Sequence, residues 1–257
     1  LGQLKVDYLE KPKDEVKEVI TEFIRPFNLA QAPLIRTLVI RLEEDRYLLI
    51  FDIHHIIFDG FSMGILIREF AQLYQGNELE ELKFQYKDYA EWQNQLLETE
   101  IIKEQEKYWI DRFSGELPIL NLPTDYPRPV KQSLEGGLIT QKLDRELTQR
   151  LNKLATDKAS TMYMILLSAV NILLSKYSRQ EDIIVGSPIA GRPRVDFNNI
   201  IGMFVNTLAM RNNPSGDQTF SSFLKEVKEN SLEAFENQTY QFEDLVENLD
   251  IVRDMSR

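Results

Sequence analysis

The sequence predicts a mixed α/β fold, an α+β sandwich, arranged in two lobes. Short strand-like runs alternate with amphipathic helical stretches along the chain. Near the middle, residues 115–137 are rich in proline and glycine and show little hydrophobic periodicity. We therefore expect an N-terminal lobe over residues 1–114, a connection over residues 115–137 and a C-terminal lobe over residues 138–257.

The N-terminal half contains a short helical pattern followed by a strand hairpin. The helical pattern covers residues 13–27 and is closed by Pro26. Strands are expected over residues 33–42 and 47–53, joined by a polar turn at residues 43–45. A helix after the second strand is indicated by a stripe of apolar residues at helical spacing: Met63, Leu66, Ile67, Phe70 and Tyr74.

Helices dominate the rest of the chain. Residues 86–113 form one long amphipathic pattern with aromatic anchors. Residues 144–158 are also amphipathic, whereas residues 162–177 are apolar nearly all round, which predicts a buried helix. The remaining elements expected, in order, are a buried strand over residues 182–188, an extended run over residues 200–211 and a late helix over residues 220–234.

The composition excludes several classes of function. The formal net charge of -11 argues against nucleic acid and anionic membranes as partners. The chain has no cysteine, which excludes disulfides, thiol nucleophiles and Cys-ligated zinc and fits the cytoplasm, where we expect the protein. No signal peptide or membrane-spanning run is visible. Two histidines and scattered carboxylates make no metal-site pattern, and serine-hydrolase and phosphate-loop motifs are absent.

The two histidines of the chain, His54 and His55, are adjacent at the predicted end of the strand over residues 47–53. Because side chains alternate along a strand, they should point in opposite directions and bind no common metal. Histidine suits proton transfer near neutral pH. Gly60 follows in the turn, where a helix opens and backbone N–H groups favour negative charge. The alternative interpretation is a packed core histidine with Asp59 as an ordinary helix N-cap.

The spacing His54-His55-x-x-x-Asp59-Gly60 matches the HHxxxDG signature of the condensation-domain superfamily of nonribosomal peptide synthetases. That superfamily resembles chloramphenicol acetyltransferase in fold. The resemblance therefore implies two chloramphenicol acetyltransferase-like lobes that form a V around a central cleft or tunnel. Further segments resemble motifs of the family in the same order: residues 26–36, 86–93, 186–192, 201–208 and 237–246, the last with Gln241 where proline is usual.

The ends of the sequence indicate a fragment. Residues 253–257 resemble the start of a further family motif, and the opening motifs of the family have no counterpart. The first residue is Leu1 and not methionine. We therefore expect the chain to lack part of the first lobe and the tail of the second.

The resemblance implies peptide-bond formation in the synthesis of antibiotics or other secondary metabolites. The α-amine of an acceptor aminoacyl thioester attacks a donor aminoacyl or peptidyl thioester, and both substrates are carried on the phosphopantetheine of carrier proteins. The expected partners are upstream and downstream peptidyl carrier proteins and an adjacent adenylation domain. The thioester stores the driving force, so the domain is expected to bind no cofactor of its own.

The resemblance places the active site at His55, which we assign jointly to removing the proton of the amine and to orienting it. Gly60 is the second catalytic candidate, because its backbone N–H opens a helix near the developing oxyanion. Two carriers must reach one histidine without colliding. A through-tunnel with the two substrates entering from opposite sides is therefore expected.

Five further residues are expected to have supporting roles, and the resemblance implies those of Asp59 and Arg192. His54 and Asp59 are expected to be structural at the active site. Arg192, from the second lobe, is the expected ion-pair partner of Asp59, with a surface loop arginine as the alternative. Asn206 and Ser62 are expected to line the cleft.

Three alternatives remain on the same fold. An epimerisation domain shares the histidine motif, but its later motifs differ from residues 201–207. A non-catalytic recruitment domain usually has a degraded histidine motif, whereas His54, His55, Asp59 and Gly60 are all present. A stand-alone acyltransferase is the third. Flanking carrier and adenylation domains would favour condensation.

Overall fold

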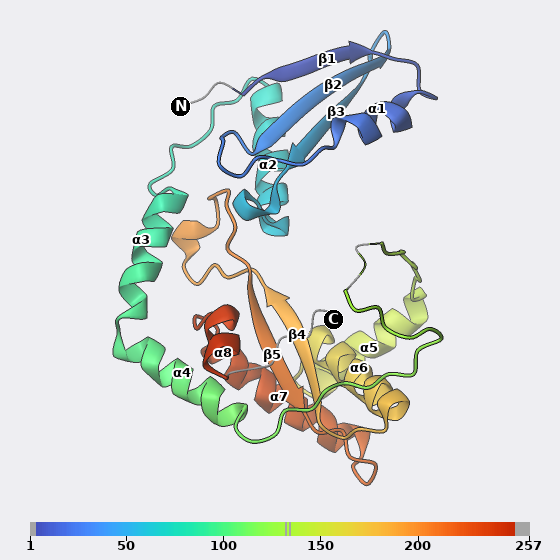
Figure 1. The fold of residues 1–257 in the computed structure, drawn as a ribbon, viewed down its shortest axis with the longest axis vertical. Coiled ribbons are helices and arrows are strands. Elements are labelled where there is room, and N and C mark those ends of the chain that lie inside the picture. The colour runs from blue at the N-terminus through green and yellow to red at the C-terminus, as the bar shows by residue number, and fades with distance from the viewer. Residues whose placement is uncertain (1–3, 132, 134, 250–257) are drawn as a thin grey trace. The chain divides into compact units, whose positions relative to one another are not determined.

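The computed structural model describes residues 4–131, 133 and 135–249 (Figure 1). The chain packs as two compact units, each built from two segments of the chain. Residues 1–92 and 192–205 belong to the first unit, and residues 93–191 and 206–257 to the second. The motif-like segment at residues 253–257 lies outside the described residues.

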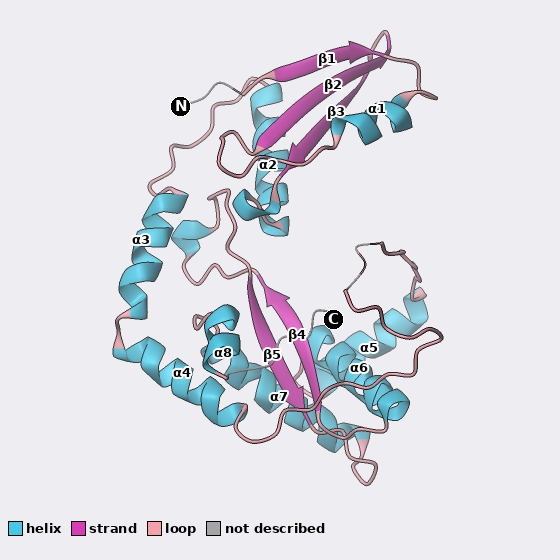
Figure 2. Ribbon diagram, viewed as in Figure 1, coloured by secondary structure: helices cyan, strands magenta, loops and turns pink. Residues whose placement is uncertain are grey.

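The sheet of the first unit contains the predicted hairpin (Figure 2). Its three described strands are β1 (Val6–Glu10), β2 (Ile35–Glu43) and β3 (Arg46–Ile53), in the order β1-β2-β3. The pair β1–β2 is parallel and the pair β2–β3 is antiparallel. Leu38 and Ile40 of β2 are 2% and 0% exposed, so this strand supplies the apolar core of the sheet.

The helix predicted after the second strand is present, but its buried face is not the one that the apolar stripe indicated. The helix α2 (Gly60–Tyr74) begins after Asp59, whose side chain caps it, and ends before Gly76, whose φ of +81° suits glycine just past a helix end. Its apolar stripe lies largely exposed, whereas Ser62 and Ile65 are the buried residues. The other helical elements here are α1 (Val16–Phe23), the 3₁₀ helices η1 (His55–Ile57) and η2 (Val195–Phe197), and the first part of α3 (Tyr86–Leu97).

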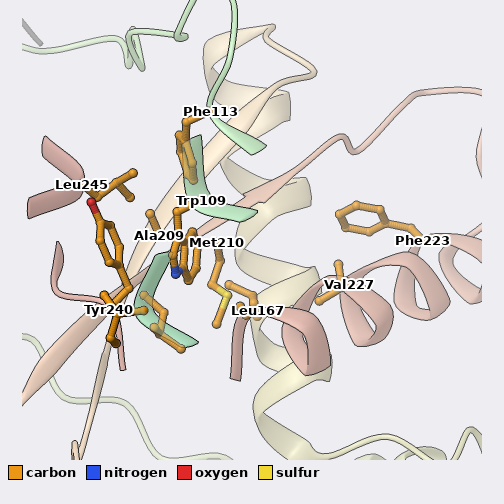
Figure 3. Close-up of a cluster of buried hydrophobic side chains, with 12 residues drawn as sticks. Trp109, Phe113, Leu167, Ala209, Met210, Phe223, Val227, Tyr240 and Leu245 are labelled. Carbon is orange, nitrogen blue, oxygen red and sulfur yellow. The ribbon is translucent and has the colours of Figure 1, made fainter. Parts of the chain in front are cut away.

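The second unit packs helices around a two-stranded antiparallel sheet. The strands are β4 (Ile183–Ile189) and β5 (Asn206–Asn212). Figure 3 shows the main apolar core, in which Trp109, Met210 and Val227 come from a helix, a strand and another helix. The helices described in this unit are α4 (Glu100–Arg112), α5 (Arg145–Asp157), α6 (Met162–Ser178), α7 (Phe220–Glu236) and α8 (Phe242–Asn248).

The division by packing differs from the expected lobe boundaries in two places. Residues 93–114 were expected in the N-terminal lobe but pack in the second unit, because Trp109 and Phe113 are buried in its core. Residues 192–205 were expected in the C-terminal lobe but pack in the first unit, where Phe204 is buried.

Three expectations about individual elements are wrong. The long helix over residues 86–113 is broken, because Thr99 has an extended backbone and its hydroxyl donates to the carbonyl of Leu96, 2.7 Å away. The extended run over residues 200–211 is a strand only from Asn206, since backbone groups at residues 202 and 204 bind side chains instead of a neighbouring strand. The helix over residues 162–177 is not buried all round: it contacts α5, α7 and β4, and these leave one stripe exposed, namely Leu166, Val170, Leu173 and Tyr177.

Among the described residues, no single helix is long and apolar enough to cross a membrane. The bent pair α5 and α6, which meet at 104°, passes the same test together, by length and composition only.

Candidate functional site

The histidine pair lies just beyond the sheet, not in it. The strand β3 ends at Ile53, and the main-chain N–H of His54 donates to the carbonyl of Leu34 at 3.0 Å. His55 then starts the 3₁₀ helix η1. The backbone is extended only as far as His54, so strand alternation no longer supports the expectation that the two side chains point in opposite directions.

His54 caps the short helix that carries His55. Its Nδ1 accepts the main-chain N–H of Ile56 at 3.1 Å. A neutral imidazole that accepts at Nδ1 carries its hydrogen on Nε2, so this contact assigns the tautomer. The half-buried ring of His54 also lies edge-on to Phe27, with 6.0 Å between ring centroids. These contacts support the structural role assigned to His54.

His55 is oriented by backbone geometry and leaves its imidazole in solvent. Its carbonyl accepts the N–H of Phe58 at 3.3 Å, which closes the 3₁₀ turn. The side chain is exposed. Gly60, the first residue of α2, is exposed too, and nothing lies within 4 Å of the position a Cβ would occupy there. A ligand can therefore approach both residues from outside.

Asp59 is the buried end of the motif, with a side chain that is 0% exposed. Its Oδ1 accepts the N–H of Ser62 at 2.7 Å, which makes it the N-cap of α2. Its Oδ2 accepts the N–H of Phe204 at 3.1 Å. Arg192 Nη2 lies 3.3 and 3.4 Å from the two carboxylate oxygens. The expected ion pair is present, and Asp59 is an N-cap as well.

Arg192 is buried, with a side chain that is 2% exposed, so the interpretation as a surface loop arginine is wrong. Its Nη1 donates to the carbonyls of Phe197 and Ile200 at 2.6 and 2.7 Å. Its guanidinium carbon lies 3.8 Å from the ring centroid of Phe204 and 4.7 Å from that of Phe61. By packing, Arg192 belongs to the same unit as Asp59 and not to a second lobe.

Burial and hydrogen bonding act in opposite directions on this pair. Burial alone raises the pKa of Asp59, but the hydrogen bonds from Ser62 and Phe204 and the charge of Arg192 outweigh it, so the net pKa is lowered. Burial lowers the pKa of Arg192, and the charge of Asp59 partly offsets this. Asp59 is therefore held as a carboxylate.

Ser62 does not line a cleft, because it is 0% exposed. Its Oγ donates to the carbonyl of Gly202 at 2.9 Å and accepts the N–H of the same residue at 3.1 Å. Arg192 Nη2 lies 3.1 Å from the same oxygen. The expectation that Ser62 lines the cleft is therefore wrong. Its hydroxyl instead binds Gly202, 140 residues away, and so connects the loop over residues 200–204 to the start of α2.

Asn206 is also buried, at 5% exposed, and its prediction as a cleft-lining residue is wrong. Its Nδ2 donates to the carbonyls of Gln238 and Tyr240 at 2.9 and 2.8 Å. Its Oδ1 accepts the N–H of Phe242 at 3.2 Å. Asn206 therefore holds the loop before α8 onto β5, entirely within the second unit.

Three residues near the motif, Tyr86, Phe27 and Arg36, were not singled out from the sequence as site residues. The ring of Tyr86 fills the position that a Cβ of Gly202 would need, and its hydroxyl donates to the carbonyl of Met203 at 2.6 Å. The ring of Phe27 lies edge-on to His54, and the guanidinium of Arg36 stacks on Phe27. The resemblance could have indicated them, because Tyr86, Phe27 and Arg36 all lie in segments that resemble family motifs.

No group of three or more His, Cys, Asp and Glu side chains that could hold a metal ion occurs among the described residues. The arrangement instead combines an exposed imidazole, an open helix start and a buried ion pair. It can bind and move a proton at His55 while the turn behind it stays fixed.

Comparison with known proteins gives the family. A model of the condensation domain matches residues 3–257. Gramicidin S synthase 2 of Brevibacillus brevis is 54% identical over 252 residues, which are 98% of this chain but 6% of that protein. The chain therefore corresponds to a small part of this relative.

Solved structures show the same fold. The complex of the X-domain and OxyB from teicoplanin biosynthesis matches with a TM-score of 0.89 and 25% identity, covering 100% of this chain and 59% of that chain. The first condensation domain of the calcium-dependent antibiotic synthetase, in complex with substrate analogue 3a, matches with a TM-score of 0.78 and 19% identity, covering 98% and 58%. The mixed α/β fold predicted from the sequence is confirmed, and the chain belongs to the condensation-domain family.

Proposed function

We propose that this chain provides the histidine of a domain that forms peptide bonds between two carrier-bound thioesters. The α-amine of the acceptor attacks the thioester carbonyl of the donor, a C–N bond forms, and the C–S bond then breaks. The proton lost by the amine passes to the imidazole of His55 and from there to the departing thiolate. The observation that carries the proposal is the exposed imidazole of His55 beside a buried, ion-paired Asp59.

In this reaction His55 has two tasks, which are to orient the amine and to accept its proton. A free α-amine titrates near pH 8, so a sizeable fraction is already neutral near pH 7. Removing the proton as the tetrahedral intermediate forms contributes about 10²–10⁴-fold, and holding the amine in line contributes more. The helix start at Gly60 presents N–H groups without intrahelical partners, which suit the developing oxyanion.

The partners follow from the same proposal. The donor and the acceptor are aminoacyl or peptidyl groups on the phosphopantetheine of two carrier proteins, with an adenylation domain adjacent. Gramicidin S synthase 2, the relative described above, is named as a synthase of gramicidin S. Because two carriers deliver substrates, the proposal requires that His55 be reached from two sides.

The test is a single-turnover assay in a protein that contains this sequence with its own loaded carriers. We expect His55→Ala to slow dipeptide formation by about 10²–10⁴-fold. Thermal melting of the variant checks that it remains folded. A near wild-type rate in the folded variant would refute the role of His55.

Product analysis separates the alternatives on this fold. A donor whose configuration inverts without dipeptide formation would indicate epimerisation. Binding of a partner protein with no turnover would indicate a recruitment domain. The X-domain structure, solved as a complex with OxyB, shows that this fold also occurs in a bound pair. The intact segment from His54 to Gly60 favours catalysis over that alternative.

A further inference from the structure

One arginine in the first unit holds several groups beside the histidine pair. Arg36 on β2 and Asp52 on β3 are directly opposite each other in the antiparallel register. Their Nη1 and Oδ2 atoms lie 2.7 Å apart, and their side chains are 17% and 16% exposed. The guanidinium is therefore fixed to the end of the sheet from which the chain enters η1.

The same guanidinium fixes the segment that precedes β2. Its Nη1 donates to the carbonyl of Arg25 at 2.7 Å, and its Nη2 donates to that of Pro26 at 2.9 Å. Its central carbon lies 3.7 Å from the centroid of the Phe27 ring. Only a planar, forked cation can bind two carbonyls and a carboxylate while stacking on a ring, so lysine cannot replace it in all four contacts.

Phe27 connects the Arg36 guanidinium to the histidine pair through its contact with His54. Its ring stands edge-on to His54 at an interplanar angle of 89°. The imidazole of His54 in turn accepts the N–H of Ile56 through Nδ1. That N–H belongs to the short helix that begins with His55. Each step from Arg36 to the turn of His55 is thus a direct contact.

We propose that Arg36 and Phe27 are positioning residues for His55. They hold the imidazole of His54 in the orientation in which Nδ1 caps Ile56, and they thereby fix the backbone that aims the side chain of His55. The inference rests on the proposed function, since it concerns how His55 is aimed for proton capture. A displacement of about 1 Å at a reacting group costs up to about 10²-fold in rate.

The test compares Phe27→Leu and Arg36→Lys with the wild type in the protein that contains the whole domain. We expect each variant to slow single-turnover dipeptide formation about tenfold. The KM for the loaded carriers should stay unchanged, because neither side chain is proposed to bind them. Nitrogen NMR of the imidazoles supplies a readout independent of activity. The wild type should show His54 with its hydrogen on Nε2, and the variants should show a mixture of tautomers.

Arg41→Lys is the matched control. Arg41 lies on the same strand and pairs with Glu10 at 3.3 Å, but it does not contact the segment over residues 25–27 through any hydrogen bond described for it. We expect it to change neither the rate nor the tautomer.

Two results would overturn the inference. One is an unchanged His54 tautomer in Phe27→Leu; the other is a loss of rate in Arg41→Lys equal to that in Arg36→Lys. Failure of the proposed function gives a different result, namely a folded His55→Ala variant that turns over at the wild-type rate. In that case the tautomer measurement still decides whether Phe27 orients His54.

Discussion

The two ends of the segment His54–Gly60 are built in opposite ways. At the histidine end, the imidazole of His55 is exposed on one 3₁₀ turn, which is closed by backbone hydrogen bonds among residues 54–58. At the aspartate end, the carboxylate of Asp59 is 0% exposed and bonded to residues far away in the sequence. The difference indicates that His55 carries the proposed chemistry of the segment, whereas Asp59 stabilises its fold. Changes at Asp59 should appear first as lost stability, and changes at His55 as lost rate.

The largest effect is expected at the buried ion pair. Removing one member leaves a buried charge without its partner, so Asp59→Ala should lower the free energy of unfolding by about 3–5 kcal/mol. Urea titration provides the measurement. Asp144→Ala is a matched control, because Asp144 caps α5 through Oδ1 with the same 2.7 Å bond to Leu147 but is exposed. Its loss should be about 1 kcal/mol.

The double variant Asp59→Ala/Arg192→Ala sharpens this test. It removes both charges, so its loss should be smaller than the sum of the two single losses. Strict additivity would mean that the two side chains are not energetically coupled. If Asp59→Ala lowered the free energy of unfolding no more than Asp144→Ala, the burial of Asp59 would add nothing to its role as an N-cap. The contrast between Asp59 and His55 would then be wrong.

A smaller loss is expected at Ser62. Ser62→Ala leaves the N–H and the carbonyl of Gly202 buried without their partner, which should cost about 1–3 kcal/mol. Ser221→Ala is the control, because Ser221 is an exposed residue of α7, and its effect should stay within about 0.5 kcal/mol. Equal losses in the two variants would show that the bond between Ser62 and Gly202 contributes nothing net.

The support of Asp59 should also depend on pH. Because its pKa is lowered in the folded state, the carboxylate contributes its full stability above the ordinary aspartate pKa of about 3.9. The contribution is lost as the pH falls through the lower folded-state pKa. The difference in unfolding free energy between wild type and Asp59→Asn should therefore be constant from about pH 7 to 5 and shrink below about pH 4. If the folded-state pKa of Asp59 were raised instead, the difference in unfolding free energy would grow as the pH falls. Asp45→Asn is the control, because Asp45 lies in an exposed turn.

The contrast between the two ends also explains which features could be predicted from sequence. Local patterns predicted the hairpin and most helices, because an apolar period and a polar turn such as residues 43–45 act over short distances. The pairing of Asp59 with Arg192 was available only through the resemblance to a family. No periodicity in this sequence relates two positions 133 residues apart.

Several of the errors concern polar groups whose partners are distant in sequence. Ser62 and Asn206 were expected to line the cleft, but both are buried. In the structure both satisfy backbone groups that would otherwise be buried without partners. The residues after Ile200 were predicted as a strand, but the N–H groups at Gly202 and Phe204 bind Ser62 and Asp59.

The smallest effect is expected at the histidine end, and the two histidines should differ. His54→Ala removes an acceptor from the N–H of Ile56 and an edge contact with Phe27, so it should cost about 1 kcal/mol. His55→Ala removes an exposed side chain and should change the free energy of unfolding by less than about 0.5 kcal/mol. Urea titration at pH 7 measures both. If His55→Ala lowered the free energy of unfolding as much as Ser62→Ala, His55 would stabilise the fold. The contrast between an exposed catalytic end and a buried structural end of the segment would then be wrong.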